Sequence, residues 1–121
     1  MNSKKTLVFG ASLKPERYSN MVIHSLVKNK QAVVAFGLRE GMVAGIEIKT
    51  TLIPHSDIDT ITLYLGVERQ QPYYEYLISL APKRVIFNPG TYNAAFIELL
   101  QKNDIEAEAA CTLVLLGTNQ Y

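Results

Sequence analysis

The segment Leu7–Leu26, LVFGASLKPERYSNMVIHSL, decides the fold class of this chain. The run Thr6–Phe9 is β-branched and apolar, which predicts a buried strand, and Gly10 ends it. Apolar residues within Ser19–Lys30 recur at three- and four-residue spacing, which predicts a helix. A strand, a glycine turn and a helix in succession indicate a site for a phosphate group.

The turn departs from the dinucleotide fingerprint G-x-G-x-x-G, which would place glycines at Ser12 and Pro15. The Ser12 hydroxyl is instead suited to donate to a phosphate oxygen. Because Pro15 stands where a short loop would already be helix, we expect a longer loop, roughly Ala11–Tyr18, with Arg17 in it. The free N–H groups after Ser19 would add an anion-binding helix end. The alternative is a purely structural loop with a solvated arginine.

The start of the predicted helix carries two further signals. Ser19 is a residue type that favours the N-cap position. Tyr18 stands where it would pack on Ile23 as a hydrophobic staple. We therefore expect the helix to begin directly after Ser19.

Composition narrows the class of protein. The 121 residues fit a single domain over 1–121, with 48% apolar and 19% charged residues. A net charge of +1 disfavours nucleic acid as a partner. No apolar run approaches the length of a membrane span, and the start MNSKK lacks the apolar stretch of a signal peptide. The single Cys111 excludes an internal disulfide and suits a cytoplasmic location. Two histidines and one cysteine predict no metal site.

Strand and helix signals alternate along the rest of the chain, which indicates parallel strands joined by crossover helices. The fold class predicted is therefore α/β, a Rossmann-like, doubly wound, mostly parallel sheet of about five strands with helices on both faces. Further strands are expected at Ala32–Phe36, Ile46–Ile48 (a short edge strand), Asp59–Leu65, Arg84–Phe87 and Glu106–Ala110, helices at Gln71–Leu80 and Asn93–Asn103, and a turn of helix within Leu52–Ile58.

Glycines follow the strand ends, so their turns gather on one edge of the predicted sheet. They are Gly10, Gly37, Gly66 and Gly90. The strand from Asp59 is expected beside the first strand, opposite the second, which creates a topological switch point at the carboxyl end of the first strand. Ligands of open α/β sheets bind in the crevice at such a point.

The motif VFGASLKPERYSNMVIHSL resembles the start of the small stand-alone CoA-binding domain proteins, which are related to the N-terminal domain of the succinyl-CoA synthetase alpha subunit. Gly10, Ser12, Pro15, Arg17 and Ser19 match the family pattern in register. Later blocks, KRVIFNPGTYNAAF and Cys111, match more weakly, and the resemblance covers nearly the whole chain. It implies a CoA-binding Rossmann-like fold, with the diphosphate at the first turn and the adenosine toward the end of the second strand.

The candidate ligand-binding residues lie in the turns after four strands. They are Gly10, Ala11, Ser12, Pro15, Arg17, Tyr18, Ser19 and Asn20 in the first turn, Gly37, Leu38 and Arg39 in the second, Leu65, Gly66 and Val67 in the third, and Asn88, Pro89 and Gly90 in the fourth.

No catalytic set is apparent, which favours a non-enzymatic role. The two histidines fall within a predicted helix (His24) and a loop (His55), and neither stands at the carboxyl end of a strand. Cys111 follows the last strand, where a packing role is favoured over a reactive one.

Two functions remain open, and a domain with a vestigial pocket is a third possibility. One is a non-catalytic binding or regulatory module for coenzyme A or an acyl-CoA. The other is an NAD(P)-binding Rossmann-like domain, enzymatic or redox-sensing. Arg39 followed by Glu40 at the end of the second strand favours a phosphorylated ribose, which CoA and NADP share. The expected partners are a small nucleotide ligand and either a second copy of the chain or an unidentified protein, with no nucleic acid and no membrane.

Overall fold

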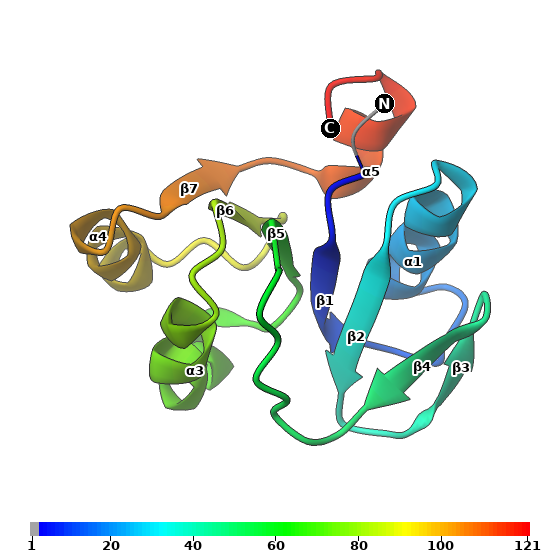
Figure 1. Ribbon diagram of the computed structural model, residues 1–121, viewed down its shortest axis with the longest axis horizontal. Helices are drawn as coiled ribbons and strands as arrows, with labels where there is room; N and C mark the ends of the chain where they lie inside the picture. The colour runs from blue at the N-terminus through cyan, green and yellow to red at the C-terminus, as the bar shows by residue number, and fades with distance from the viewer. Residues whose placement is uncertain (1–2) are drawn as a thin grey trace.

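The computed structural model describes residues 3–121, so Met1 and Asn2, the first residues of the predicted domain and of its MNSKK start, lie outside the described residues. The chain forms one sheet of seven strands in the order β3-β4-β2-β1-β5-β6-β7, and the sheet is twisted (Figure 1). Neighbouring strands pair in parallel except β3 with β4. The strands are β1 Thr6–Ala11, β2 Val33–Gly37, β3 Gly41–Val43, β4 Ile46–Lys49, β5 Thr60–Leu63, β6 Arg84–Phe87 and β7 Glu106–Ala109.

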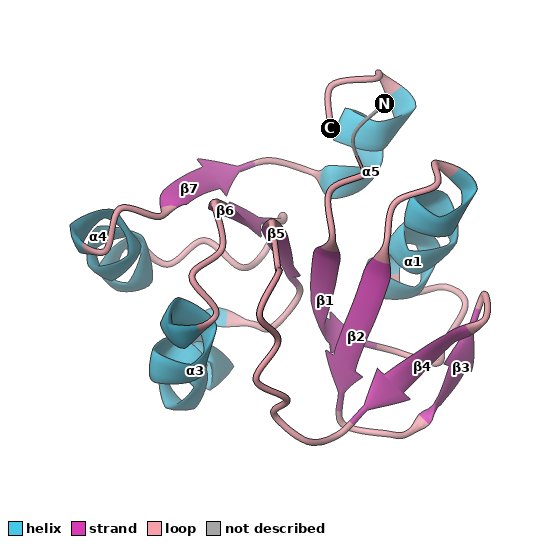
Figure 2. Cartoon of the chain, in the orientation of Figure 1, coloured by secondary structure: helices cyan, strands magenta, loops and turns pink. Residues whose placement is uncertain are grey.

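Helices cover both faces of the sheet, as Figure 2 shows. Helices α1 and α5 pack on one face, and α3 and α4 on the other. The helices are α1 Tyr18–Lys28, α2 Val67–Gln70, the 3-10 helix η1 Gln71–Tyr73, α3 Tyr74–Ser79, α4 Ala94–Lys102 and α5 Thr112–Gly117. The predicted α/β, doubly wound class is confirmed, but the sheet has seven strands where about five were expected.

Each face of the sheet has its own apolar core, because successive residues of a strand point to opposite faces. Along β1, Leu7 and Phe9 pack with the residues of α3 and α4, including Leu77 and Phe96. Val8 packs on the other face with the residues of α1 and α5. Burial on both faces explains why β1, β2 and β6 are nearly continuous runs of apolar and β-branched residues.

The order of strands places a topological switch point at β1. Its neighbours are β2 on one side and β5 on the other, both parallel to it. The loop after β1 leads to α1 on one face of the sheet and the loop after β5 leads toward α3 on the other, so these two loops diverge. This arrangement was predicted, and it opens a crevice at the carboxyl end of β1.

Helix α1 begins earlier than the sequence indicated. Arg17 is its N-cap residue, no side chain among residues 3–121 caps it, and Ser19 is already buried in its first turn. The prediction of Ser19 as the N-cap was wrong. The predicted staple was also wrong, because Tyr18 is 66% exposed while Ile23 is 0% exposed. Both errors follow from a helix start displaced toward the loop.

The segment Leu52–Ile58 contains no turn of helix, against expectation. Pro54 restricts the residue before it to extended conformations and has no N–H to donate. The neighbouring carbonyl of Ile53 is held instead by the Tyr76 hydroxyl and by the His55 backbone N–H, which donate to it. The segment is therefore an irregular connection anchored to α3.

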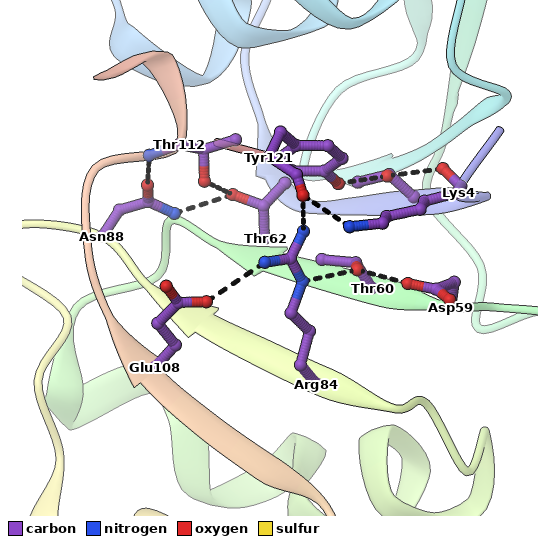
Figure 3. Close-up of polar contacts among 10 residues, drawn as sticks. Lys4, Asp59, Thr60, Thr62, Arg84, Asn88, Glu108, Thr112 and Tyr121 are labelled. Carbon is purple, nitrogen blue, oxygen red and sulfur yellow. Dashed lines mark hydrogen bonds and ion pairs between the residues drawn. The ribbon is translucent and has the colours of Figure 1, made fainter. Parts of the chain in front are cut away.

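A cluster of polar side chains lies on the face of the sheet that α5 covers (Figure 3). The Arg84 guanidinium on β6 donates to Thr60 Oγ1 at 2.9 Å, to Glu108 Oε1 at 3.1 Å and to the backbone oxygen of Tyr121 at 3.3 Å. It also stacks on the Tyr121 ring, 4.6 Å from the ring centre. These contacts fix the segment after α5 against the sheet. Among the helices of residues 3–121, none combines the length and the apolar character needed to cross a membrane.

Candidate functional site

A cleft of about 650 Å³ lies at the carboxyl ends of β1, β2 and β5. Its walls come from the loop after β1, the turn after β2, the start of the loop after β5, and η1. The volume is within the range of small-molecule sites in proteins. The cleft thus occupies the crevice that the topology creates at the switch point.

The structure brings most of the sequence-predicted residues into this cleft. Those that line it are Gly10, Ala11, Ser12, Arg17, Tyr18, Ser19, Gly37, Leu38, Arg39, Leu65 and Pro89. Those that do not line it are Pro15, Asn20, Gly66, Val67, Asn88 and Gly90. The first and second turns therefore supply the predicted wall, while the third and fourth contribute one residue each from the predicted set.

Two glycines allow the strand ends to approach one another. Gly10 has φ +100°, a conformation that side-chain-bearing residues rarely adopt, and the pairing of β1 with β2 is irregular around it. A Cβ on Gly37 would fall inside 3.0 Å of the Ala11 carbonyl oxygen, which real Cβ atoms essentially never do. Both positions require glycine for the backbone geometry of the cleft.

The loop after β1 is fixed from within. Asn20, which is buried, donates from Nδ2 to the Ser12 carbonyl oxygen at 3.0 Å. The Ser12 hydroxyl oxygen accepts from the Lys14 backbone N–H at 3.1 Å, which leaves its hydrogen available to a ligand. Asn20 does not line the cleft but holds the loop that does.

The N-terminus of α1 faces the cleft through Tyr18 and Ser19. This helix has 11 residues, its first turn carries no acidic residue, and no side chain among the described residues caps it. Uncapped N–H groups at the start of a helix favour an anion. The loop and the helix start therefore form a site for negatively charged groups.

Basic side chains surround the cleft without acidic partners. They are Lys14, Arg17, Arg39 and Arg69, all exposed. None of them takes part in an ion pair among residues 3–121, and no carboxylate of those residues lines the cleft. Four uncompensated cations around one concave surface create a positive potential that attracts an anionic ligand.

An aromatic surface lies beneath part of the cleft. Phe36 at the end of β2 stacks on Phe9 with ring centres 4.6 Å apart. Tyr73 on η1 meets both rings edge-on, at 5.1 Å from Phe9 and 5.7 Å from Phe36. Phe36 and Tyr73 line the cleft, so a planar, weakly polar group finds a matching surface there.

Tyr64 lines the cleft but is not poised for proton transfer at neutral pH. Burial raises the pKa of its hydroxyl to about 12, against hydrogen bonds with Thr62 and Thr112 that lower it. The Tyr64 side chain packs with the core on the face of α1 and α5. Neither His24 nor His55 lines the cleft.

The fourth turn contributes little to the cleft wall because the Asn88 side chain makes hydrogen bonds inside the fold (Figure 3). Asn88 donates from Nδ2 to Thr62 Oγ1 at 2.7 Å and to the Leu63 carbonyl oxygen at 3.0 Å. Its Oδ1 accepts from the Thr112 backbone N–H at 2.9 Å. Asn88 thus ties β5 and β6 to the start of α5 and does not line the cleft.

The third turn is held by a buried glutamine. Gln70 Nε2 donates to the carbonyl oxygens of Leu65 and Thr91, each at 2.9 Å, and its Oε1 accepts from Asn93 Nδ2 at 2.9 Å. Gly66 and Val67 lie outside the cleft wall in this arrangement, whereas Arg69 on α2 lines it.

Sequence reasoning missed six residues of the cleft wall: Leu13, Lys14, Phe36, Tyr64, Arg69 and Tyr73. Leu13 and Lys14 stand inside the predicted loop, and Phe36 and Tyr64 flank predicted glycine turns, so a wider window around each turn would have included them. Arg69 and Tyr73 belong to α2 and η1, where no motif marks them.

These features define the class of the protein: a Rossmann-like α/β domain with a basic cleft at its topological switch point. A family model described as a CoA binding domain matches residues 4–117, and the chain therefore belongs to that family.

Solved structures share the fold. A crystal structure of an uncharacterized protein is 37% identical, with all of both chains covered and a TM-score of 0.97. A hypothetical protein from Pyrococcus horikoshii OT3 is 24% identical over 98% of this chain and 84% of its own, with a TM-score of 0.84. A Thermus thermophilus structure, cell-free ID.343, is 18% identical over 98% of this chain and 91% of its own, also at 0.84. No curated protein matches the chain.

Proposed function

We propose that this protein binds coenzyme A or an acyl-CoA in the cleft, as a non-catalytic binding or regulatory module. The observation that carries the proposal is the ring of cations without acidic partners, Lys14, Arg17, Arg39 and Arg69, around the crevice at the switch point. Membership of the CoA binding domain family supports the same ligand class.

The diphosphate of CoA is proposed to lie on the loop after β1. The Ser12 hydroxyl hydrogen, the Arg17 guanidinium and the start of α1 are the donors available there. Hydrogen bonds to a charged partner are stronger than those between neutral groups. Gly10 and Gly37 allow the ends of β1, β2 and β5 to pack closely beneath this loop, because a Cβ on either glycine would meet neighbouring backbone atoms.

The adenosine is proposed to lie toward the end of β2. Arg39 follows this strand, and a guanidinium presents paired donors that match a phosphate monoester. Because such a phosphate carries roughly −1.5 to −2 charges at neutral pH, the 3′-phosphate of CoA is the group that Arg39 suits best. Phe36 and Tyr73 supply an adjacent aromatic surface.

We propose a binding role rather than a catalytic one. The described residues that line the cleft include no histidine, cysteine, aspartate or glutamate, the side chains that most often act as acids, bases or nucleophiles. Burial keeps the pKa of Tyr64 at about 12 and its hydroxyl neutral at physiological pH.

An NADP-binding domain is the second candidate. Its ribose also carries a phosphate monoester, so Arg39 suits it as well. Glu40, the acid that would instead favour the free ribose hydroxyls of NAD, does not line the cleft. The two candidates therefore differ in the rest of the ligand rather than at Arg39.

A thermal-shift series with CoA, dephospho-CoA, NADP and NAD tests the proposal. Ligand at ~100 times its dissociation constant should add about 2.7 kcal/mol to the free energy of unfolding. We expect CoA to give the largest shift. A shift with NAD alone would contradict the proposal, and a shift with NADP exceeding that with CoA would favour the second candidate.

A further inference from the structure

We infer that the cleft holds CoA by its nucleotide half and leaves the thiol end in solvent, so that free CoA and its thioesters bind alike. The inference rests on the proposed function, because it concerns how much of the same ligand the cleft engages. It adds the ligand specificity, which the family membership leaves open.

Among residues 3–121, three of the four free cations of the cleft lie on one side of it, on the loop after β1 and the turn after β2, whereas the fourth, Arg69, is on α2. Lys14 and Arg17 project from the loop after β1, and Arg39 from the turn after β2. Ser12 contributes a hydroxyl hydrogen on the same side. These groups match the phosphates of the nucleotide half, which are the charged part of CoA.

With the adenosine toward Arg39, the pantetheine arm leaves in the opposite direction, toward the carboxyl ends of β5 and β6. Within the described residues, Pro89 is the only member of the turn after β6 that lines the cleft. Proline has no N–H to donate. The Asn88 side chain beside it is fully engaged with Thr62, Leu63 and Thr112.

On the side of β5, the exposed Arg69 is the one free charged side chain of the cleft wall within the described residues, and its charge suits a phosphate rather than a neutral amide. The carbonyl oxygens of Leu65 and Thr91 already accept from the amide of Gln70, whose oxygen in turn accepts from Asn93. No buried side-chain nitrogen or oxygen among residues 3–121 lacks a hydrogen-bond partner. The wall on this side therefore has no unpartnered buried side chain to offer the amide groups of a pantetheine arm.

The thiol end also meets no reactive side chain in the cleft wall. Tyr64 lines the cleft, but its side chain packs with the core on the face of α1 and α5, and burial raises the pKa of its hydroxyl to about 12. Cys111 is half-buried at the start of α5 and does not line the cleft. An acyl group at the end of the arm thus adds neither a polar contact nor a reaction, and it extends into solvent.

Calorimetric titration of the full chain with four ligands tests the inference. The ligands are CoA, acetyl-CoA, hexanoyl-CoA and adenosine 3′-phosphate 5′-diphosphate, the nucleotide half alone. We expect all four dissociation constants to agree within about fivefold, less than the ~1.4 kcal/mol that a tenfold change represents. A difference of more than about tenfold between CoA and either thioester, or between CoA and its nucleotide half, would overturn the inference.

A second readout follows the thiol itself. CoA is treated with iodoacetamide with and without saturating protein, and alkylated CoA is measured by mass spectrometry, which separates it from alkylated Cys111. We expect equal rates, and protection of the bound thiol would overturn the inference. If CoA and its nucleotide half both fail to bind, the proposed function fails and this inference with it. If CoA binds but one thioester is strongly preferred, only the inference fails.

Discussion

The carbonyl oxygen of Ala11 lies against Gly37, in the space that a Cβ on residue 37 would fill. This contact sets how closely the ends of β1 and β2 approach beneath the cleft. We expect Gly37→Ala to push the two strand ends apart and to lower the free energy of unfolding by roughly 1–3 kcal/mol, the usual cost of overpacking. Chemical denaturation measures this change. Gly117→Ala is the control, because nothing lies within 4 Å of a Cβ there, and equal losses in both variants would contradict the account.

Arg17 is expected to hold the diphosphate. Arg17→Ala should weaken CoA binding by roughly 1.5–3 kcal/mol, the range for a hydrogen bond to a charged group. The melting temperature of the free protein should barely change, since Arg17 is exposed and makes no ion pair among residues 3–121. Lys28→Ala removes a charge at the opposite end of the same helix and should leave CoA affinity unchanged. Unchanged affinity for CoA in Arg17→Ala would show that Arg17 does not contact the ligand.

Arg39 is expected to bind the phosphate on the adenosine ribose. The wild-type protein should prefer CoA to dephospho-CoA, and Arg39→Ala should lose most of that preference. Because the side chain is exposed, the preference should also shrink as salt is added. Competition titrations of the two ligands measure it. An equal preference in both proteins would remove Arg39 from the site.

Gln70 is expected to hold the turns after β5 and β6 together. Its amide is fully buried and joins Leu65, Thr91 and Asn93. Gln70→Ala leaves these groups without their partner, and we expect a loss of about 2–4 kcal/mol in the free energy of unfolding. Gln71→Ala, at the exposed neighbouring position, is the matched control and should cost far less. Comparable losses of stability in the two variants would contradict the role of the Gln70 amide and point to a general effect of substitution in these helices.

Ionisation of Tyr64 should lower the free energy of unfolding at alkaline pH. Its pKa is about 12 in the folded protein, against an ordinary value of 10.0, so the unfolded chain ionises first as the pH rises. The stabilisation is complete below pH 10 and is lost as the pH rises toward 12, by an amount on the order of 2–3 kcal/mol. Denaturation at several pH values measures this. Tyr64→Phe should show a shallower decline, although Tyr76 and Tyr121, whose pKa values burial also raises, remain. An identical decline in both proteins would contradict the assignment.

The central strands were predictable because burial on both faces leaves a strong local signal. Thr6–Phe9 and Arg84–Phe87 are apolar or β-branched runs followed by turn residues, and both are strands in the structure. Strand β3 was not predicted, since its three residues, Gly41–Val43, are too short to show a period. Its turn, at Ala44 and Gly45, has positive φ at both residues, and an alanine in the sequence does not predict that conformation.

Helix α5 was missed for a different reason. Its residues Thr112–Gly117 form a short apolar run that has the same pattern as a buried strand, and only packing on the face with α1 makes it a helix. Asn88 was predicted at the ligand because it follows a strand end, but Thr112 engages its side chain from a helix distant in sequence. Arg69 and Tyr73 reach the cleft through tertiary placement alone.

Native mass spectrometry tests the central claim most directly. The protein is mixed with equal amounts of CoA, dephospho-CoA, NADP and NAD, and the mass that accompanies the folded chain is read. The account predicts one CoA per chain in the wild type, and a smaller fraction of that adduct in Arg17→Ala at the same ligand concentration. An adduct of NAD in place of CoA, or no adduct at any ligand concentration, would contradict it.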